Sequence, residues 1–207
     1  MIPERDIAIV VESQKRFESA IAGLTDEVVA RPSPLPGWTV GHVLTHVARN
    51  ADSHRRRTEA AGRSEVIDQY PGGWEGREAE IAAGADRAAS LIIADVHTSA
   101  AAMEASWRAA PDLAWQNVTR DVGGRERPLS ALVMRRWQEL EVHLVDLDIG
   151  ITYRDWPDAF VAEWLPRLQA FFVDRPPTPT GLDERDELAW LYGRLQRTDL
   201  PVLPSWG

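Results

Sequence analysis

Four stretches of this chain repeat apolar residues every three or four positions, and this pattern restricts the fold more than any other feature. The stretches cover residues 4–23, 39–61, 76–109 and 129–149. Spacing of this kind places the apolar side chains on one face of an α-helix. Four helices of this length favour a mainly α, four-helix bundle in which one connection is elaborated.

The connections between these stretches are rich in residues that break helices. Residues 33–38 and 69–73 carry closely spaced Pro and Gly and are predicted loops. Thr39, directly after the first of these loops, is a suitable N-cap for the helix that follows. Residues 111–128 contain a Gly-Gly pair and a proline, and they predict a connection with a short hairpin.

Two regions are expected, a bundle over residues 1–150 and a short C-terminal extension over residues 151–207. Residues 156–173 fit an aromatic-rich helix, residues 176–181 a stiff proline linker, and residues 183–197 a short last helix. The extension is too small to be expected to fold alone. We therefore expect an α-rich appendage that packs on the bundle.

Charge and composition exclude several classes of function. Acidic residues number 32 against 23 basic ones, a net charge of -9, which argues against binding to the phosphate backbone of nucleic acid. No apolar run reaches the length of a membrane span, and the charged N-terminus lacks the apolar core of a signal peptide. A cytoplasmic location, away from the membrane, is expected.

The chain contains no cysteine, which excludes disulfides, thiolate metal ligands and a cysteine nucleophile. Lys15 is the only lysine, so Schiff-base chemistry would depend on this one side chain. Lys15 lies in a polar stretch, where we expect it to be exposed. We therefore expect neither a cysteine nor a lysine of this chain to act as a nucleophile.

Glu139 and His143 are the leading candidates for metal ligands. They are four residues apart, so they share one helix face, beside the apolar stripe. His46 lies in a similar place beside the stripe of residues 39–61, and two facing helices could bring the three side chains together. Two histidines and a carboxylate with an open fourth position suit catalytic zinc or another divalent ion. The alternative is an ordinary pair on a helix face.

The other histidines are weaker candidates. His42 falls in the first helical turn, near the positive end of the dipole, and is expected to be exposed or to cap the helix. His54 adjoins the arginine run at residues 55–57, which predicts a solvated helix end. His97 lies in a polar, alanine-rich stretch and is predicted at the surface.

Two acidic residues flank His143. Glu141 is two positions away and is expected to point elsewhere, because residues i and i+2 do not share a helix face. Asp146 is three positions away and could accept a hydrogen bond from the imidazole, or it could be a surface charge at the helix end.

Two segments resemble the signatures of a known family. Residues 35–51, LPGWTVGHVLTHVARNA, resemble the N-terminal motif of the mycothiol-dependent maleylpyruvate isomerase family. Residues 139–147, ELEVHLVDL, resemble its second motif. The family belongs to the DinB-like metal-binding four-helix bundles, and the resemblance implies that zinc or another divalent metal binds His46, Glu139 and His143.

The resemblance also implies the chemistry. Mycothiol, or a similar small thiol, would be activated at the metal and add to a small, anionic electrophile. The expected reactions are cis–trans isomerisation of maleylpyruvate to fumarylpyruvate, or transfer of the thiol. Arg77 resembles an arginine that opens the third helix, and Arg194 resembles a C-terminal Gly-Arg arginine; each would hold an anionic group, the alternative being a surface salt bridge. The tail is expected to be shorter than the family's usual C-terminal domain.

Two other functions fit the same residues. The chain could be a metal-binding regulatory or interaction protein that has lost catalysis, with its aromatic tail helix as a partner surface. It could also be a metal-dependent hydrolase, which needs a general base, and Asp146 and Asp52 are the candidates. Arg77 and Arg194 discriminate between these functions, because an enzyme for anions needs them at the metal cleft. The expected oligomeric state is a monomer or a homodimer.

Overall fold

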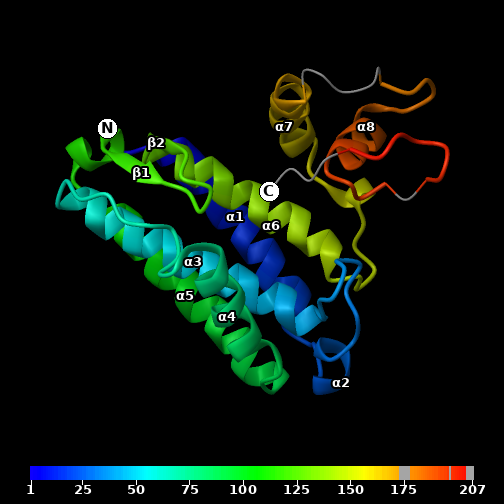
Figure 1. The fold of residues 1–207 in the computed structure, drawn as a ribbon, viewed down its shortest axis with the longest axis horizontal. Helices are drawn as coiled ribbons and strands as arrows, with labels where there is room; N and C mark the ends of the chain where they lie inside the picture. Colours follow the sequence, from blue (N-terminus) through cyan, green and yellow to red (C-terminus); the bar gives the residue numbers. More distant parts are fainter. Residues whose placement is uncertain (173–177, 196, 204–207) are drawn as a thin grey trace. The chain divides into compact units, whose positions relative to one another are not determined.

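The computed structural model describes residues 1–172, 178–195 and 197–203. The chain divides into two compact units, Met1–Leu147 and Asp148–Gly207. Both units are built from helices, so the prediction of a mainly α protein is confirmed (Figure 1). Within the described part, none of the helices is long and apolar enough to cross a membrane.

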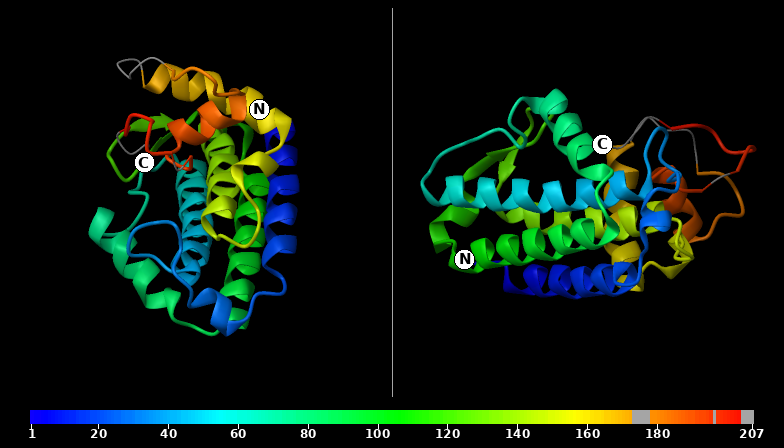
Figure 2. Two further views of the ribbon diagram at one scale, coloured as in Figure 1. Left: turned by 90° about the vertical axis from the view of Figure 1, so that its right-hand side faces the viewer. Right: turned by 90° about the horizontal axis from the view of Figure 1, so that it is seen from below.

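Four long helices form the bundle of the first unit. α3 packs along α5 and α1 packs along α6, and the end-on view in Figure 2 shows the four around a common core. The core consists of apolar side chains from these helices, with Phe17, Leu44 and Trp107 fully buried. The bounds of the helices are α1 Glu4–Ile21, α3 Val40–Gly62, α5 Ala89–Ala109 and α6 Ser130–Asp146.

The prediction of one long helix over residues 76–109 is wrong. The stretch forms two helices, α4 Gly73–Ala85 and α5 Ala89–Ala109. α4 returns the chain along α3, so that α5 runs in the same direction as α3 (Figures 1 and 2). The Asp26 carboxylate accepts a hydrogen bond of 2.7 Å from the backbone N–H of Ala89 and so helps α5 to begin there. This contact comes from a distant segment, and the alanine-rich sequence carries no local signal for it.

The loops contain short elements. A four-residue helix, α2 Asp26–Val29, precedes α3 and was not predicted. The predicted hairpin is present between α5 and α6: β1 Val118–Arg120 pairs antiparallel with β2 Glu126–Pro128, after a 3₁₀ turn at Asp112–Gln116. The hairpin lies against α3 and α6.

α4 approaches α3 closely because glycine lies at the contact. A Cβ atom on Gly41 would lie 2.2 Å from the backbone oxygen of Ala85. We expect Gly41→Ala to lower the free energy of unfolding by about 1–3 kcal/mol, because one of the two backbones must move. Gly23→Ala is the control, since a Cβ there meets nothing within 4 Å. Equal urea midpoints for the two variants would contradict the close approach.

The second unit has a small aromatic core of its own. It contains a 3₁₀ turn Tyr153–Asp155, α7 Asp158–Phe171 and α8 Glu184–Leu191. The rings of Trp156, Phe160 and Tyr192 lie 5.5–6.3 Å apart between centroids. α8 ends earlier than predicted because Gly193, at φ +71°, takes a left-handed conformation that stops the helix. Residue 173 of the predicted helix, residues 176–177 of the predicted linker and residue 196 lie outside the described residues.

Candidate metal centre

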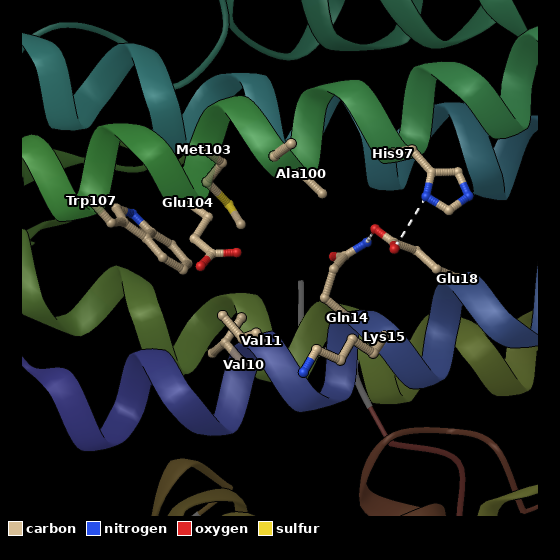
Figure 3. Close-up of a pocket in the computed structure, with 11 residues that line it drawn as sticks. Val10, Val11, Gln14, Lys15, Glu18, His97, Ala100, Met103, Glu104 and Trp107 are labelled. Atoms are coloured by element: carbon tan, nitrogen blue, oxygen red, sulfur yellow. Dashed lines mark hydrogen bonds and ion pairs between the residues drawn. The ribbon is translucent and has the colours of Figure 1, made fainter.

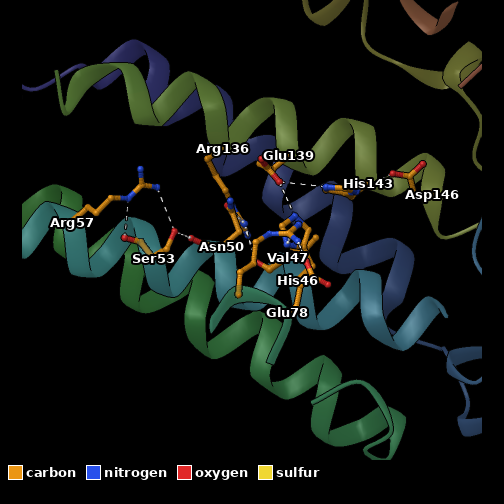
Figure 4. Close-up of polar contacts among 11 residues, drawn as sticks. His46, Val47, Asn50, Ser53, Arg57, Glu78, Arg136, Glu139, His143 and Asp146 are labelled. Atoms are coloured by element: carbon orange, nitrogen blue, oxygen red, sulfur yellow. Dashed lines mark hydrogen bonds and ion pairs between the residues drawn. The ribbon is translucent and has the colours of Figure 1, made fainter. Parts of the chain in front are cut away.

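Three side chains from two helices converge inside the bundle. His46 lies on α3, and Glu139 and His143 lie one turn apart on α6 (Figure 4). Glu139 Oε2 is 3.0 Å from His46 Nε2 and 3.3 Å from His143 Nε2. One ligand atom from each of the three residues lies within 4.8 Å of the others. The structure therefore brings together the three residues that the sequence predicted as metal ligands.

This donor set fits a divalent ion. Two imidazole nitrogens and a carboxylate oxygen are borderline donors of the kind that zinc accepts. A tetrahedral ion with bonds of about 2.1 Å holds its ligands about 3.4 Å apart. The separations of 3.0 and 3.3 Å are close to this value, so small side-chain shifts would admit the ion.

Local structure fixes the position of His46 on α3. Thr39 caps the helix: its hydroxyl accepts a hydrogen bond from the backbone N–H of His42, and its own N–H donates to His42 Nδ1. The capping role predicted for His42 is therefore confirmed, and His42 is engaged away from the cluster. Because α3 begins at Val40, His46 falls on the helix face toward α6.

Electrostatics prepare the metal-free cluster for a cation. Burial raises the pKa of Glu139, but hydrogen bonds from His143 and His46 outweigh it and hold that pKa well below its usual value. Burial lowers the pKa of His46 to about 4. Burial also acts to lower the pKa of His143, but the hydrogen bonds to Asp146 and Glu139 outweigh it and raise that pKa. At neutral pH the cluster thus holds an ionised carboxylate and a neutral His46.

Asp146 supports His143 from behind. Its Oδ2 lies 2.8 Å from His143 Nδ1, and the carboxylate is buried. Of the two predicted roles, the hydrogen-bond acceptor is correct and the surface charge is wrong. A carboxylate in this position holds the Nδ1 proton, so that Nε2 is turned toward the ligand position.

Asp146→Asn is expected to weaken metal binding by about 10- to 100-fold, because the ligand imidazole loses its charged acceptor.

The raised pKa of His143 also predicts that the free energy of unfolding depends on pH. In the metal-free protein, protonated His143 adds stability below its unfolded pKa, near 6.5, and this stability is lost as pH rises through the folded pKa. Asp146→Asn should flatten that dependence. Chelator competition and urea denaturation between pH 6 and 9 measure both effects.

Asp52→Asn serves as the control for Asp146→Asn. Asp52 is also on the bundle, but it pairs with Arg49 at 3.2 Å instead of with a cluster histidine. We expect unchanged metal affinity in this variant. Equal losses in the two variants would contradict a specific role for Asp146.

Arg77 reaches the cluster from α4. Its Nη2 lies 3.3 Å from His46 Nδ1, and its guanidinium carbon lies 5.5 Å and 5.7 Å from the ring centroids of Trp38 and Trp74. The same side chain also forms an ion pair with Glu78. Arg77 therefore forms the salt bridge that was the alternative prediction, and it also contacts a candidate metal ligand.

The contact between Arg77 and His46 depends on the proton of the imidazole. Arg77 can only donate, so Nδ1 must be the acceptor, and the ring proton lies on Nε2, facing Glu139. An ion on Nε2 would require the proton to move to Nδ1. Nδ1 and Arg77 would then both be donors, and Arg77 would have to leave His46. Its guanidinium would become available for an anion.

The predicted solvated end of α3 is wrong for two residues. His54 is buried against Trp107, with ring centroids 6.0 Å apart, and the Arg57 side chain is buried as well. α5, the 3₁₀ turn and β1 cover this part of α3. Arg57 is eleven positions after His46, close to three full turns, and this spacing is the signal that places the two on one face.

Three other predictions for polar residues are correct. Glu141 points away from His143, and its carboxylate accepts hydrogen bonds from Ser13 and Arg16. His97 is 44% exposed and pairs with Glu18 at 3.1 Å. Lys15 is 66% exposed.

A hollow of about 370 Å³ lies elsewhere, between α1 and α5 (Figure 3). Its wall is mixed, with Val10, Met103 and Trp107 beside Gln14 and Glu18. Glu18 is already engaged, by Gln14 at 2.9 Å and by His97. The three cluster residues do not line this hollow, so it is separate from the candidate metal centre.

Arg194 belongs to the second unit. Its Nη1 donates a hydrogen bond of 2.6 Å to the backbone oxygen of Tyr192. The predicted role of Arg194 at the metal cleft stays a prediction.

A mainly α bundle with two histidines and a carboxylate facing each other across α3 and α6 is the arrangement of the DinB-like four-helix bundles. The family model described as "Mycothiol maleylpyruvate isomerase N-terminal domain" matches residues 10–148, about two thirds of the chain. The chain therefore belongs to this family, and the resemblance found in the two motifs is confirmed.

Solved structures agree with this fold. A crystal structure of the mycothiol-dependent maleylpyruvate isomerase aligns with a TM-score of 0.82 at 22% identity, over 98% of this chain and 96% of the other. A histidine-to-alanine mutant of the mycothiol-dependent maleylpyruvate isomerase aligns with a TM-score of 0.85 at 21% identity and the same coverage. The first alignment covers nearly all of the solved chain, so the prediction of a shortened tail is wrong relative to it. No curated protein matches the chain.

Proposed function

We propose that this protein is a divalent-metal-dependent isomerase that uses mycothiol to convert maleylpyruvate to fumarylpyruvate. The observation that carries the proposal is the convergence of His46, Glu139 and His143 within 4.8 Å in a chain of this family. The absence of cysteine adds support, because the chain itself supplies no thiol. The family is one of isomerases, which makes the chain an enzyme.

Zinc is the ion that we propose for the three ligands. A zinc ion there would lower the pKa of an adjacent thiol, and the resulting thiolate would add to the cis double bond and leave after rotation about the new single bond. Asp146 orients His143, and burial keeps His46 neutral and ready to bind. The remaining task for the protein is to hold the anionic substrate.

Arg77 is the residue of the first unit that we assign to this task. The rings of Trp38 and Trp74 restrict the side chain, and its ion pair with the exposed Glu78 would have to open when an anion binds. Once released from His46, its planar guanidinium can pair with a carboxylate or with the enolate oxygen that develops during addition. Arg194 is proposed to hold a second anionic group. The same arrangement would permit permanent transfer of the thiol to an electrophile that does not eliminate.

The test is an isomerisation assay on zinc-loaded protein. We expect conversion of maleylpyruvate when mycothiol is present and none when it is omitted, with glutathione as the comparison thiol. Conversion without any thiol would overturn the proposed mechanism. Metal loading with no conversion in the presence of mycothiol would favour a binding protein that has lost catalysis.

Arg77→Ala and Arg194→Ala test the two proposed anion holders. Each is expected to lower kcat/KM while the metal stays bound. The decrease should correspond to a loss of about 2–4 kcal/mol of transition-state stabilisation. Arg63→Ala is the control, because Arg63 is exposed and pairs with Glu65 at the end of α3. Steady-state kinetics and metal analysis of each variant make the comparison. An Arg194→Ala enzyme as active as the wild type would remove Arg194 from the site.

A further inference from the structure

Two arginines are buried inside the bundle, and neither forms an ion pair with a carboxylate of the described residues. Arg136 on α6 is 0% exposed and Arg57 on α3 is 3% exposed. Figure 4 shows both side chains in the space between α3 and α6, in line with the cluster. A buried guanidinium without a countercharge costs several kcal/mol of desolvation. An anion that binds there would offset this cost.

The two arginines differ in how well their own hydrogen bonds are satisfied. Arg136 donates to the oxygens of Val47, Asn50 and Gln14 at 2.8–3.1 Å, and so joins three helices. Arg57 makes two long contacts, both of 3.3 Å and both to Ser53 on its own helix. Its Nη1 group donates to no atom of the described residues. Among the described residues, Arg136 leaves only its Nε without a partner, whereas Arg57 has a terminal nitrogen without one and holds the others by long contacts.

The carboxylates nearest to Arg57 are engaged elsewhere. Its pKa is lowered to about 10, chiefly by burial, and the acidic groups that oppose this effect are Tyr70, Asp121 and Glu139. Asp121 pairs with Arg127 at 2.9 Å, and Glu139 is held by the two cluster histidines. Tyr70 is a neutral phenol, and burial raises its pKa further. The acidic groups of the described residues that act on Arg57 are therefore either paired or neutral.

The position of Arg57 relates it to the cluster. The contact between its Nε and the backbone oxygen of Ser53 shows that the side chain turns back toward the start of α3. The guanidinium then lies near the level of Ser53, seven residues from His46, or about 10 Å along the helix axis. The length of a short-chain dicarboxylate is comparable with this distance, and its entry would require Asn50 and Arg136, which are buried along the interval, to shift.

We propose that Arg57 is a substrate-binding residue whose guanidinium holds the carboxylate that lies farthest from His46, Glu139 and His143, and so selects short-chain dicarboxylates. The inference rests on the proposed function. It adds a specificity determinant inside the bundle, distinct from Arg77 at the cluster. Arg136, whose two terminal nitrogens donate to protein oxygens, holds α6 to α3 and α1.

The experiment measures binding of adipate, a six-carbon dicarboxylate, to zinc-loaded protein without any thiol. Isothermal titration compares the wild type with Arg57→Met, which keeps the length of the side chain and removes the charge. We expect the dissociation constant to rise by about 10- to 100-fold in Arg57→Met, as for the loss of a charge-assisted hydrogen bond. Arg55→Met is the matched control, because Arg55 pairs with Glu59 at 3.0 Å, and it should bind as the wild type does.

Three outcomes would overturn the inference. Equal adipate affinity in Arg57→Met and the wild type would leave Arg57 a purely structural role. Equal affinity of the wild type for adipamide, the neutral diamide, would show that charge is not recognised. Complete displacement of adipate by an equal concentration of chloride would indicate an adventitious ion only. If Arg57→Met does not fold, Arg57→Lys and the comparison of adipate with adipamide in the wild type decide the matter.

Failure of this inference and failure of the proposed function give different results. Adipate binding without thiol does not depend on isomerisation. Adipate binding that requires Arg57 in a protein that never isomerises maleylpyruvate would overturn only the proposed function. Isomerisation by a protein whose adipate affinity ignores Arg57 would overturn only the inference.

Discussion

His46→Ala is expected to lose its bound metal and, with it, all thiol-dependent isomerisation. His46 is the one candidate ligand on α3, and the other two lie on α6. Without it, only Glu139 and His143 remain, and two ligands from one helix do not close a site. We expect the metal dissociation constant to rise by more than about 100-fold. Loss of a residue that only hydrogen-bonds to a metal ligand typically weakens binding by about 10- to 100-fold, and loss of the ligand itself should have a larger effect.

The readouts are metal content after dialysis and activity with mycothiol. His97→Ala is the control, because His97 is exposed and pairs with Glu18 on α1. Circular dichroism should show an intact helical fold in both variants, since His46 packs in the polar cluster and His97 is exposed. Full retention of metal by His46→Ala would refute the assignment of the three ligands.

Arg136→Ala is expected to lower the free energy of unfolding by about 3–5 kcal/mol. The substitution leaves the oxygens of Val47, Asn50 and Gln14 without their donor and opens a cavity where a fully buried side chain had been. Glu139 follows Arg136 by one turn on α6, so metal affinity should fall as well. Urea denaturation of the metal-free protein measures the stability effect.

Two further variants show which property of Arg136 matters. Arg136→Met fills the space with apolar atoms, and replacement of a buried charge by a well-packed apolar side chain is often neutral. We expect it to be closer to the wild type than Arg136→Ala. Arg108→Ala, at an exposed arginine that pairs with Glu104 within α5, should change stability by less than about 0.5 kcal/mol. A neutral Arg136→Ala would show that the network contributes little.

The candidate ligands could be predicted from the sequence because their geometry is local. The i,i+4 spacing of Glu139 and His143 fixes their common face, and Thr39 fixes the start of α3 and hence the face of His46. The same reasoning failed for residues 76–109. There, a side chain from another helix, Asp26, stabilises the start of α5, and the nearby Gly84 and Asp86 are only weak signals of a break.

The burial of charged residues was also predicted wrongly. The run at residues 55–57 has the composition of a solvated helix end, but composition does not report which side chain faces the neighbouring helices. Arg55 is on the surface and Arg57 is inside, two positions apart. The two arginines differ in the helix face on which they lie, which follows from their spacing from His46. This spacing predicts burial only when the face of α3 toward α6 is known.

The contact between Arg77 and His46 would link the proposed binding of a metal to the proposed binding of an anion. In the metal-free protein Arg77 donates to His46 Nδ1 and is therefore occupied. An ion on Nε2 ends that hydrogen bond, so an anion that pairs with Arg77 should bind more tightly to the loaded protein. Linkage is reciprocal, so the anion should raise the affinity for the metal by the same factor. An enzyme of this kind would hold its metal most firmly while it is working and release it most readily when substrate is scarce.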